Sequence, residues 1–291
     1  MPKRTVARHF TAAILTAAAA LAAGCASVGG TAAPATVHEI APDGGWTWFN
    51  DERAIWLPGG TMLVGYVRGD GRIAVTNFDP ATGERHESVL SGEGAVERDD
   101  HNNPSLTLLP DGRVLAVYSR HNTDTHFFWR ISRNANPRGT ADWTEQRVEA
   151  VGARNTYANT YRLQGEGNRI FNFHRALNFN PTLTISNDLG ESWSDPIHFI
   201  TAGTGRQRPY PRYVSNHRDR IDLIYTDAHP RDFNNSIYHM FYRDGAFRLS
   251  DGSVLRALQA LPIAHDAGER GTVVYEYSEE PWGAGEGPDD W

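Results

Sequence analysis

A tight turn followed by an apolar strand recurs about every fifty residues, and this repeat limits the fold more than any other feature of the sequence. Full copies occur at 58–64, 110–117, 167–173 and 218–224, and a fifth begins at 270. The anchor residues Met62, Val114, Ile170, Ile221 and Val273 are separated by 52, 56, 51 and 52 residues. Because this period suits one four-stranded blade, the repeat predicts an all-β fold, a β-propeller of four-stranded antiparallel blades.

A second motif agrees with this architecture. Residues 186–193 read SNDLGESW, which fits the Asp-box pattern S-x-D-x-G-x-x-W of sialidase-like propellers. Ser186 and Asp188 are suited to bond the backbone of a tight turn, Gly190 accepts a positive φ, and Trp193 can pack against the blade. We interpret this motif as structural.

The repeats set the expected domain organisation. Residues 45–291 are predicted to form the propeller. They hold about four and a half repeats, whereas propellers close with whole blades. We therefore expect the domain to be incomplete at its C-terminus, with an irregular five-blade ring as the alternative.

The N-terminus reads as a targeting segment. Lys3, Arg4 and Arg8 precede an apolar stretch at 10–23, and LAAGC at 21–25 resembles a lipoprotein cleavage box. Residues 1–25 are therefore predicted to be a lipoprotein signal peptide with Cys25 as the lipidation site, and 26–44 a flexible tether. We expect an exported protein, held at the bacterial cell envelope or surface by its lipid anchor alone.

Composition narrows the possible partners. The formal net charge is −7 and the mature region has no run of Lys or Arg, so a nucleic-acid partner is not expected. Cys25 is the only cysteine, which leaves no thiol for a disulfide or a cysteine metal site. No metal motif is present. Asp232, Asn234 and Asn235 offer oxygen ligands for a structural calcium ion, or form an Asx-rich turn.

The register of the strands predicts that several titratable residues lie together at one rim of the central channel. The start of the first strand and the end of the second lie at the same face of a blade. His101 and Tyr157 each stand thirteen residues before an anchor, and Arg175 stands five after one. The residues placed at this rim are His101, Arg120, His121, Tyr157, Arg175, Tyr210, Asp227 and His229. A cluster of this kind in a concavity is a candidate site.

For several neighbouring residues the sequence allows either a role in the site or a structural role. Tyr161, Tyr213 and Tyr225 are either part of the site or core aromatic residues. Asp99 and Asp100 cap a loop, or one of them orients the imidazole of His101. His174 alternates with Arg175 along the chain, so we place it on the opposite side.

Short segments of the chain together resemble the BNR-4 repeat family, which includes seven-bladed ulvan lyases. These segments are DHNNP (100–104), YSRH (118–121), FNFHR (171–175), RPY (208–210), TDAHPR (226–231) and NSIYHM (235–240). The resemblance runs from about Trp46 to the C-terminus.

The resemblance implies catalytic roles for His101, His121 and Arg175, together with Tyr157 or Tyr161. It also implies a second aromatic residue, which is Tyr210, Tyr213 or Tyr225; we group these with Arg120 and His229 as substrate-binding candidates. The implied reaction is β-elimination on an anionic, uronic-acid-containing polysaccharide, without a cofactor. Arg175 suits neutralisation of the uronate, and His121 or a tyrosine suits removal of the C5 proton. Tyr157 or His101 would protonate the leaving oxygen.

Two other functions fit the same sequence. The Asp-box suggests a sialidase-like glycoside hydrolase, for which an arginine triad and a tyrosine–glutamate pair would be needed. A glycan-binding propeller without catalytic activity is the third hypothesis.

Overall fold

The structure is a computed structural model that describes residues 37–202 and 208–278, and these residues confirm the predicted all-β fold. Three antiparallel four-stranded sheets follow one another along the chain, each in sequential strand order. They are β1 (Ala54–Trp56), β2 (Met62–Val67), β3 (Ile73–Phe78) and β4 (Arg85–Val89); β5 (Ser105–Leu108), β6 (Val114–Tyr118), β7 (His126–Ile131) and β8 (Arg147–Ala150); and β9 (Thr156–Leu163), β10 (Arg169–Arg175), β11 (Pro181–Ser186) and β12 (Ile197–His198). We refer to them as blades one, two and three.

Blade four is larger than the other three. It contains β14 (Pro211–Ser215), β15 (Ile221–Thr226), β16 (Ile237–Arg243), β17 (Ala246–Arg248) and β18 (Val254–Ala257), with β20 (Thr272–Tyr275) also paired to β16. The short strands β13 (Ile200–Thr201) and β19 (Ile263–Ala264) pair with each other in parallel. Short 3₁₀ turns complete the described elements: η1 (Asp100–Asn102), η2 (Thr140–Asp142), η3 (Gln164–Glu166), η4 (Leu177–Phe179), η5 (Leu258–Ala260) and η6 (His265–Ala267).

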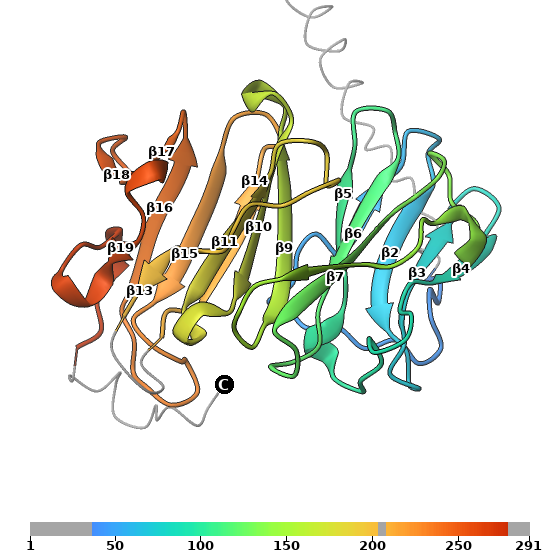
Figure 1. Cartoon of the computed structure of the whole chain (residues 1–291), viewed down its shortest axis with the longest axis horizontal. Coiled ribbons are helices and arrows are strands. Elements are labelled where there is room, and N and C mark those ends of the chain that lie inside the picture. Colours follow the sequence, from blue (N-terminus) through green and yellow to red (C-terminus); the bar gives the residue numbers. More distant parts are fainter. Residues whose placement is uncertain (1–36, 203–207, 279–291) are drawn as a thin grey trace, which may run out of the picture. The chain divides into compact units, whose positions relative to one another are not determined.

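The core lies between blades rather than within one sheet. One cluster joins Leu63 and Ile73 of blade one to Tyr118 of blade two, and two further clusters join blade two to three and three to four. Because β6 is covered on both faces, its residues are apolar without alternation, and all five are buried. Figure 1 shows the sheets following one another in chain order.

The Asp-box has the structural role expected for it. The Ser186 hydroxyl accepts a hydrogen bond from the Gly190 N–H (2.8 Å), and Asp188 Oδ1 accepts one from the Ser192 N–H (2.9 Å). Gly190 has a φ of +87°. Trp193 lies edge-on to Phe127 of β7, with ring centroids 5.3 Å apart, and so packs against the neighbouring blade.

The fifth repeat, whose turn begins at residue 270, does not form a blade of its own among the described residues. β20 does not pair with a hairpin partner of its own; it binds the outer edge of β16, where Tyr238 faces Val273. β17 pairs with only part of β16, which leaves the backbone groups of residues 237–239 without a partner from β17. β20, which follows later in the chain, pairs with these residues.

The segment that precedes β1 forms hydrogen bonds and an ion pair with several other blades. The Asp51 backbone carbonyl accepts from Thr160 N (3.1 Å) in blade three, and the Asp51 carboxylate lies 3.0 Å from Arg212 Nη2 in blade four. The Glu52 carbonyl accepts from Leu106 N (2.8 Å) in blade two. The segment therefore lies across the first strands of blades two, three and four.

The N-terminal part of the chain lies partly outside the described residues. The predicted signal peptide and Cys25 belong to the part that the structure does not describe. Within the predicted tether, Asp43 accepts a hydrogen bond from Gly69 N (2.9 Å) and the Glu39 carbonyl accepts one from Arg85 (2.6 Å). Residues 39 and 43 of the predicted tether therefore contact blade one. None of the helices in the described part of the chain has the length and apolar character that a membrane crossing requires.

Candidate active site

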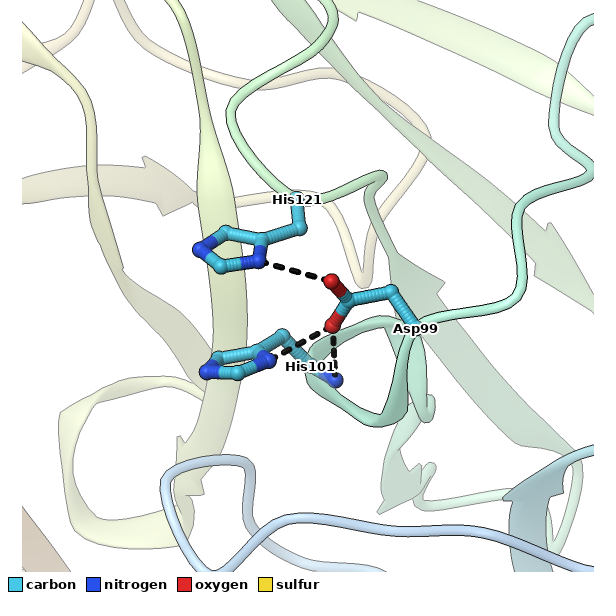
Figure 2. A group of neighbouring side chains, drawn as sticks. All are labelled: Asp99, His101 and His121. Carbon is cyan, nitrogen blue, oxygen red and sulfur yellow. Dashed lines mark hydrogen bonds and ion pairs between the residues drawn. The ribbon is translucent and has the colours of Figure 1, made fainter.

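Two imidazole rings share one carboxylate at the end of blade two. His101 lies in η1, directly before β5, and His121 follows β6, so the hairpin brings both residues to the same edge. Their Nδ1 atoms lie 2.6 and 2.8 Å from the two oxygens of Asp99, and the rings stack with centroids 4.0 Å apart (Figure 2). Asp99 also caps η1 by accepting a hydrogen bond from His101 N (2.9 Å).

This arrangement sets the tautomers of both histidines. An ionised carboxylate only accepts hydrogen bonds, so each Nδ1 must carry a proton, and each Nε2 is left as the free base when the ring is neutral. Although burial opposes it, hydrogen bonds from the His101 N–H and from both imidazoles hold the pKa of Asp99 below its ordinary value. The carboxylate is therefore ionised at neutral pH.

His121 is suited to act as a base. Burial lowers its pKa below 6.5, and the neighbouring His101 and Arg175 act in the same direction, while Asp99 opposes them. The neutral ring is therefore the favoured form at neutral pH, with its Nε2 lone pair available.

A β-bulge directs Tyr157 toward the histidines. Asn159 faces Phe173 and Thr156 faces Arg175, so two residues of β9 stand opposite one residue of β10. Tyr157 has a φ of +71°, an uncommon conformation for a residue with a side chain. Its ring lies 5.5 Å from that of His101. Burial raises the pKa of the Tyr157 phenol, although Arg175 opposes the effect, so the phenol keeps its proton.

Arg175 presents its positive charge beside this tyrosine. Its guanidinium carbon lies 5.0 Å from the centre of the Tyr157 ring, and Nη1 donates to the Tyr210 hydroxyl (2.8 Å). Nη2 donates to Thr156 Oγ1 (3.1 Å). Among the described residues, no carboxylate forms an ion pair with Arg175. A partly buried cation of this kind is suited to receive an anionic group of a ligand.

These side chains line one cavity of about 520 Å³, a size typical of ligand clefts. The wall contains arginines, histidines and aromatic rings, and Asp232 is the one carboxylate among its described residues. The lining residues are Trp48, Phe49, His101, His121, Tyr157, Arg175, Phe179, Arg208, Tyr210, His229, Pro230, Arg231 and Asp232. Since Asp232 pairs with Arg231 (3.3 Å), the cavity is cationic overall.

The structure brings together six of the predicted site residues: His101, His121, Tyr157, Arg175, Tyr210 and His229. Arg120 is not among the lining residues, because it forms a bidentate ion pair with Asp124.

The remaining tyrosine candidates lie in the core. Tyr161 and Tyr213 pack together between blades three and four. The Tyr225 hydroxyl accepts a hydrogen bond from Gly271 N (2.8 Å). His174 is buried as well, with Nδ1 2.7 Å from Asn155 Oδ1. Burial in the core removes these groups from the wall of the large cavity, so we do not include Tyr161, Tyr213 or Tyr225 in the site.

Sequence reasoning missed part of the cavity wall. Arg208 stands two residues before Tyr210, and Trp48 and Phe49 belong to an aromatic segment before the first repeat. These positions lie outside the hairpins, so the repeat register gave no information about them. The sequence allowed two roles for Asp99, capping the loop or orienting the imidazole of His101, and in the structure Asp99 has both roles.

The described residues include one group whose ligand atoms lie close enough together for a metal ion, namely Asp99, His101 and His121. The hydrogen bonds from both Nδ1 atoms to Asp99 already account for this grouping. Two of the suggested calcium ligands form hydrogen bonds within the protein: Asn235 Oδ1 accepts from Ala228 N (2.7 Å), and Asn234 Nδ2 donates to the Tyr277 hydroxyl (2.9 Å).

Comparisons with known proteins agree with the fold described above. A family model described as "BNR repeat-containing family member" matches residues 62–280. A solved structure described as an ulvan lyase of the polysaccharide lyase family PL25 is similar to this chain, with a TM-score of 0.60 and 17% identity over 80% of the chain. The same description occurs for a structure bound to -[GlcA(1-4)Rha3S]-, at a TM-score of 0.60 and 16% identity over 80% of the chain.

Another solved structure, of the polysaccharide lyase Uly1, has a TM-score of 0.50 and 16% identity over 78% of this chain. The chain covers 61% of each PL25 structure and 60% of Uly1. No curated protein matches the sequence. At these identities the likeness concerns the fold alone, which is a β-propeller.

Proposed function

This chain belongs to the BNR repeat-containing family, and we propose that it is a polysaccharide lyase that cleaves a uronic-acid-containing anionic glycan by β-elimination. The observation that carries the proposal is the joint placement of three groups in one cavity: a neutral histidine, a protonated phenol and an arginine that pairs with no carboxylate in the described part of the chain.

Arg175 is suited to assist the difficult step of the reaction, which is removal of the C5 proton. The proton at C5 of a uronate is weakly acidic until the charge of the adjacent carboxylate is neutralised. Arg175 is suited to bind that carboxylate and to stabilise the enolate-like intermediate, because its charge is fixed in place by Tyr210 and Thr156.

The histidine and the tyrosine take complementary roles. In the proposed reaction Nε2 of His121 removes the C5 proton, the C5 electrons form the C4–C5 double bond, and the bond from C4 to the leaving oxygen breaks. The Tyr157 phenol donates its proton to that oxygen and is reprotonated from solvent. A tyrosine base would need a lowered pKa, whereas burial raises that of Tyr157. The acid role therefore suits it better.

The proposal is tested by incubating the chain with ulvan, alginate, polygalacturonate and chondroitin sulfate while following the ultraviolet absorbance of an unsaturated uronyl product. We expect an increase with at least one of these glycans that is lost in His121→Ala and kept in His86→Ala, a histidine of the outer strand β4. Absence of product with the whole panel would contradict the lyase proposal.

Glycoside hydrolysis is the second candidate, and one observation favours it: three arginines, Arg175, Arg208 and Arg231, line the cavity. Most glycosidases, however, use two carboxyl groups flanking the scissile bond, and the described residues of this wall include only Asp232. Release of reducing sugar without an unsaturated product would support hydrolysis. Binding without turnover would support the third hypothesis, a glycan-binding propeller.

We also propose that the protein is exported and anchored through a lipid on Cys25, on the basis of the LAAGC segment. Metabolic labelling with a radioactive fatty acid tests this. We expect label in the unaltered protein and none in Cys25→Ser, and equal labelling of the two would overturn the proposal.

A further inference from the structure

We propose that Trp48 is a stacking platform for a sugar ring at the edge of the cavity. The indole lines the cavity and is 62% exposed, although large aromatic side chains are usually well buried. The inference rests on the proposed function only in that the ligand is a glycan, and it does not depend on which bond is cleaved.

The backbone around Trp48 is fixed to the loop that carries His101. Thr47 N donates to Asn103 Oδ1 (3.0 Å), and the Asn50 amide donates to the carbonyl oxygen of His101 (2.7 Å). Asn50 and Asn103 are both fully buried. Trp48 and Phe49 therefore lie between two anchors on the η1 loop, so the distance from the indole to the histidine pair is set by the fold.

The same segment is also bound to blade three. Asn50 Oδ1 accepts a hydrogen bond from Ala158 N (2.9 Å), next to Tyr157, and the Asn159 amide donates to the Phe49 carbonyl oxygen (3.0 Å). An aromatic ring on a rigid support binds a ligand with a smaller loss of conformational entropy than a ring on a mobile loop. This rigidity distinguishes Trp48 from an incidental surface tryptophan.

The walls of the cavity offer both an apolar surface and positive charge, and an acidic sugar has parts that suit each of them. A pyranose ring has a face of C–H groups, which packs well on the apolar face of an indole, and a rim of polar and charged substituents. Arg175 and Arg208 contribute positive charge to the same cavity. The ligand class that fits both features is a polysaccharide with anionic substituents.

The neighbouring Trp46 differs in its surroundings. The Arg53 guanidinium lies over its ring, 4.3 Å from the centroid. Trp48 instead meets Phe49 in an edge arrangement, with centroids 6.4 Å apart. Because the indole is 62% exposed, much of its surface is available for stacking.

The test compares Trp48→Ala with Trp56→Ala in the full chain. Trp56, in β1, is also 62% exposed and is not among the cavity-lining residues, so it is a matched control. Binding of ulvan and of the uronate polysaccharides named above is measured by affinity electrophoresis and calorimetry in a His121→Ala background, which prevents turnover. We expect Trp48→Ala to weaken binding by about tenfold or more, Trp56→Ala to leave it within about twofold, and Trp48→Phe to retain most of it.

The outcomes separate this inference from the lyase proposal. Unchanged binding in Trp48→Ala overturns the platform, whatever the activity of the unaltered chain. Binding that depends on Trp48, combined with no unsaturated product from the unaltered chain, supports the platform and removes the lyase. If the parent chain binds none of the polysaccharides, both proposals fail.

Discussion

The rings of His101 and His121 stack with centroids 4.0 Å apart, and both donate to Asp99. A positive charge on His101 at this separation opposes protonation of His121, in the same direction as the burial of His121. The neutral ring of His121 is therefore favoured, and it is available as a base.

This relationship predicts the pH dependence of activity. Burial lowers the pKa of His121 below 6.5, so the neutral base persists to lower pH than for a free histidine. We expect the acidic limb of kcat/KM to have its midpoint below pH 6.5 in the unaltered chain. The pKa of His121 measured by NMR should be higher in Arg175→Gln, because Arg175 contributes to the lowered pKa. Rate profiles and NMR titration of the imidazoles check both statements. A midpoint at or above 6.5 in the unaltered chain would contradict the assignment.

Asp99→Asn is expected to disturb the tautomers while leaving the fold intact. An amide offers one acceptor oxygen and one donor nitrogen, so one of the two imidazoles must move its proton to Nε2. We expect a loss of activity of roughly 10²-fold or more, since the comparable exchange in a Ser-His-Asp triad costs about 10⁴. Nitrogen-15 NMR of the imidazoles reports the tautomers directly. Asp111→Asn, in the exposed β5–β6 turn, is the control, and unchanged tautomers in Asp99→Asn would refute the positioning role.

Tyr157→Phe and Tyr161→Phe form a matched pair on one strand. Tyr157 faces the cavity, whereas the Tyr161 hydroxyl is buried without a hydrogen-bond partner among the described residues. We expect Tyr157→Phe to lower kcat by roughly 10²–10⁴-fold, as for loss of a general acid. Tyr161→Phe should keep the activity and leave the free energy of unfolding equal or higher, because it removes an unsatisfied polar group. Steady-state kinetics and urea unfolding test the pair, and the reverse order of effects would invalidate the choice of Tyr157.

His174 is expected to make the stability of the fold depend on pH. Burial lowers its pKa to about 3, whereas in the unfolded chain it titrates near 6.5. Between these values the unfolded state binds the extra proton, so the free energy of unfolding falls as the pH decreases, by up to about 1.4 kcal/mol per pH unit. Urea unfolding at pH 7 and pH 5 measures the slope. His174→Gln should reduce it, and an equal slope in both chains would contradict the prediction.

The sequence by itself determined the architecture of the protein. Turn residues and apolar strands are local features, and their spacing anchored β2, β6, β10 and β15 in the structure. The register of the hairpin that joins β5 to β6 also placed His101 and His121 at one edge, because strand pairing within a hairpin follows from the chain itself.

Only the tertiary structure decided which tyrosine enters the cavity. Tyr157 and Tyr161 are four residues apart, so regular alternation would put them on the same face of β9. The bulge opposite His174 changes the direction of Tyr157 and leaves Tyr161 in the core. Contacts between distant segments, such as Asn50 with Ala158, 108 residues apart, likewise place Trp48 and Phe49 in the wall. The repeat follows from short-range chemistry, whereas the cavity forms where blades meet, and that meeting depends on packing that no single repeat encodes.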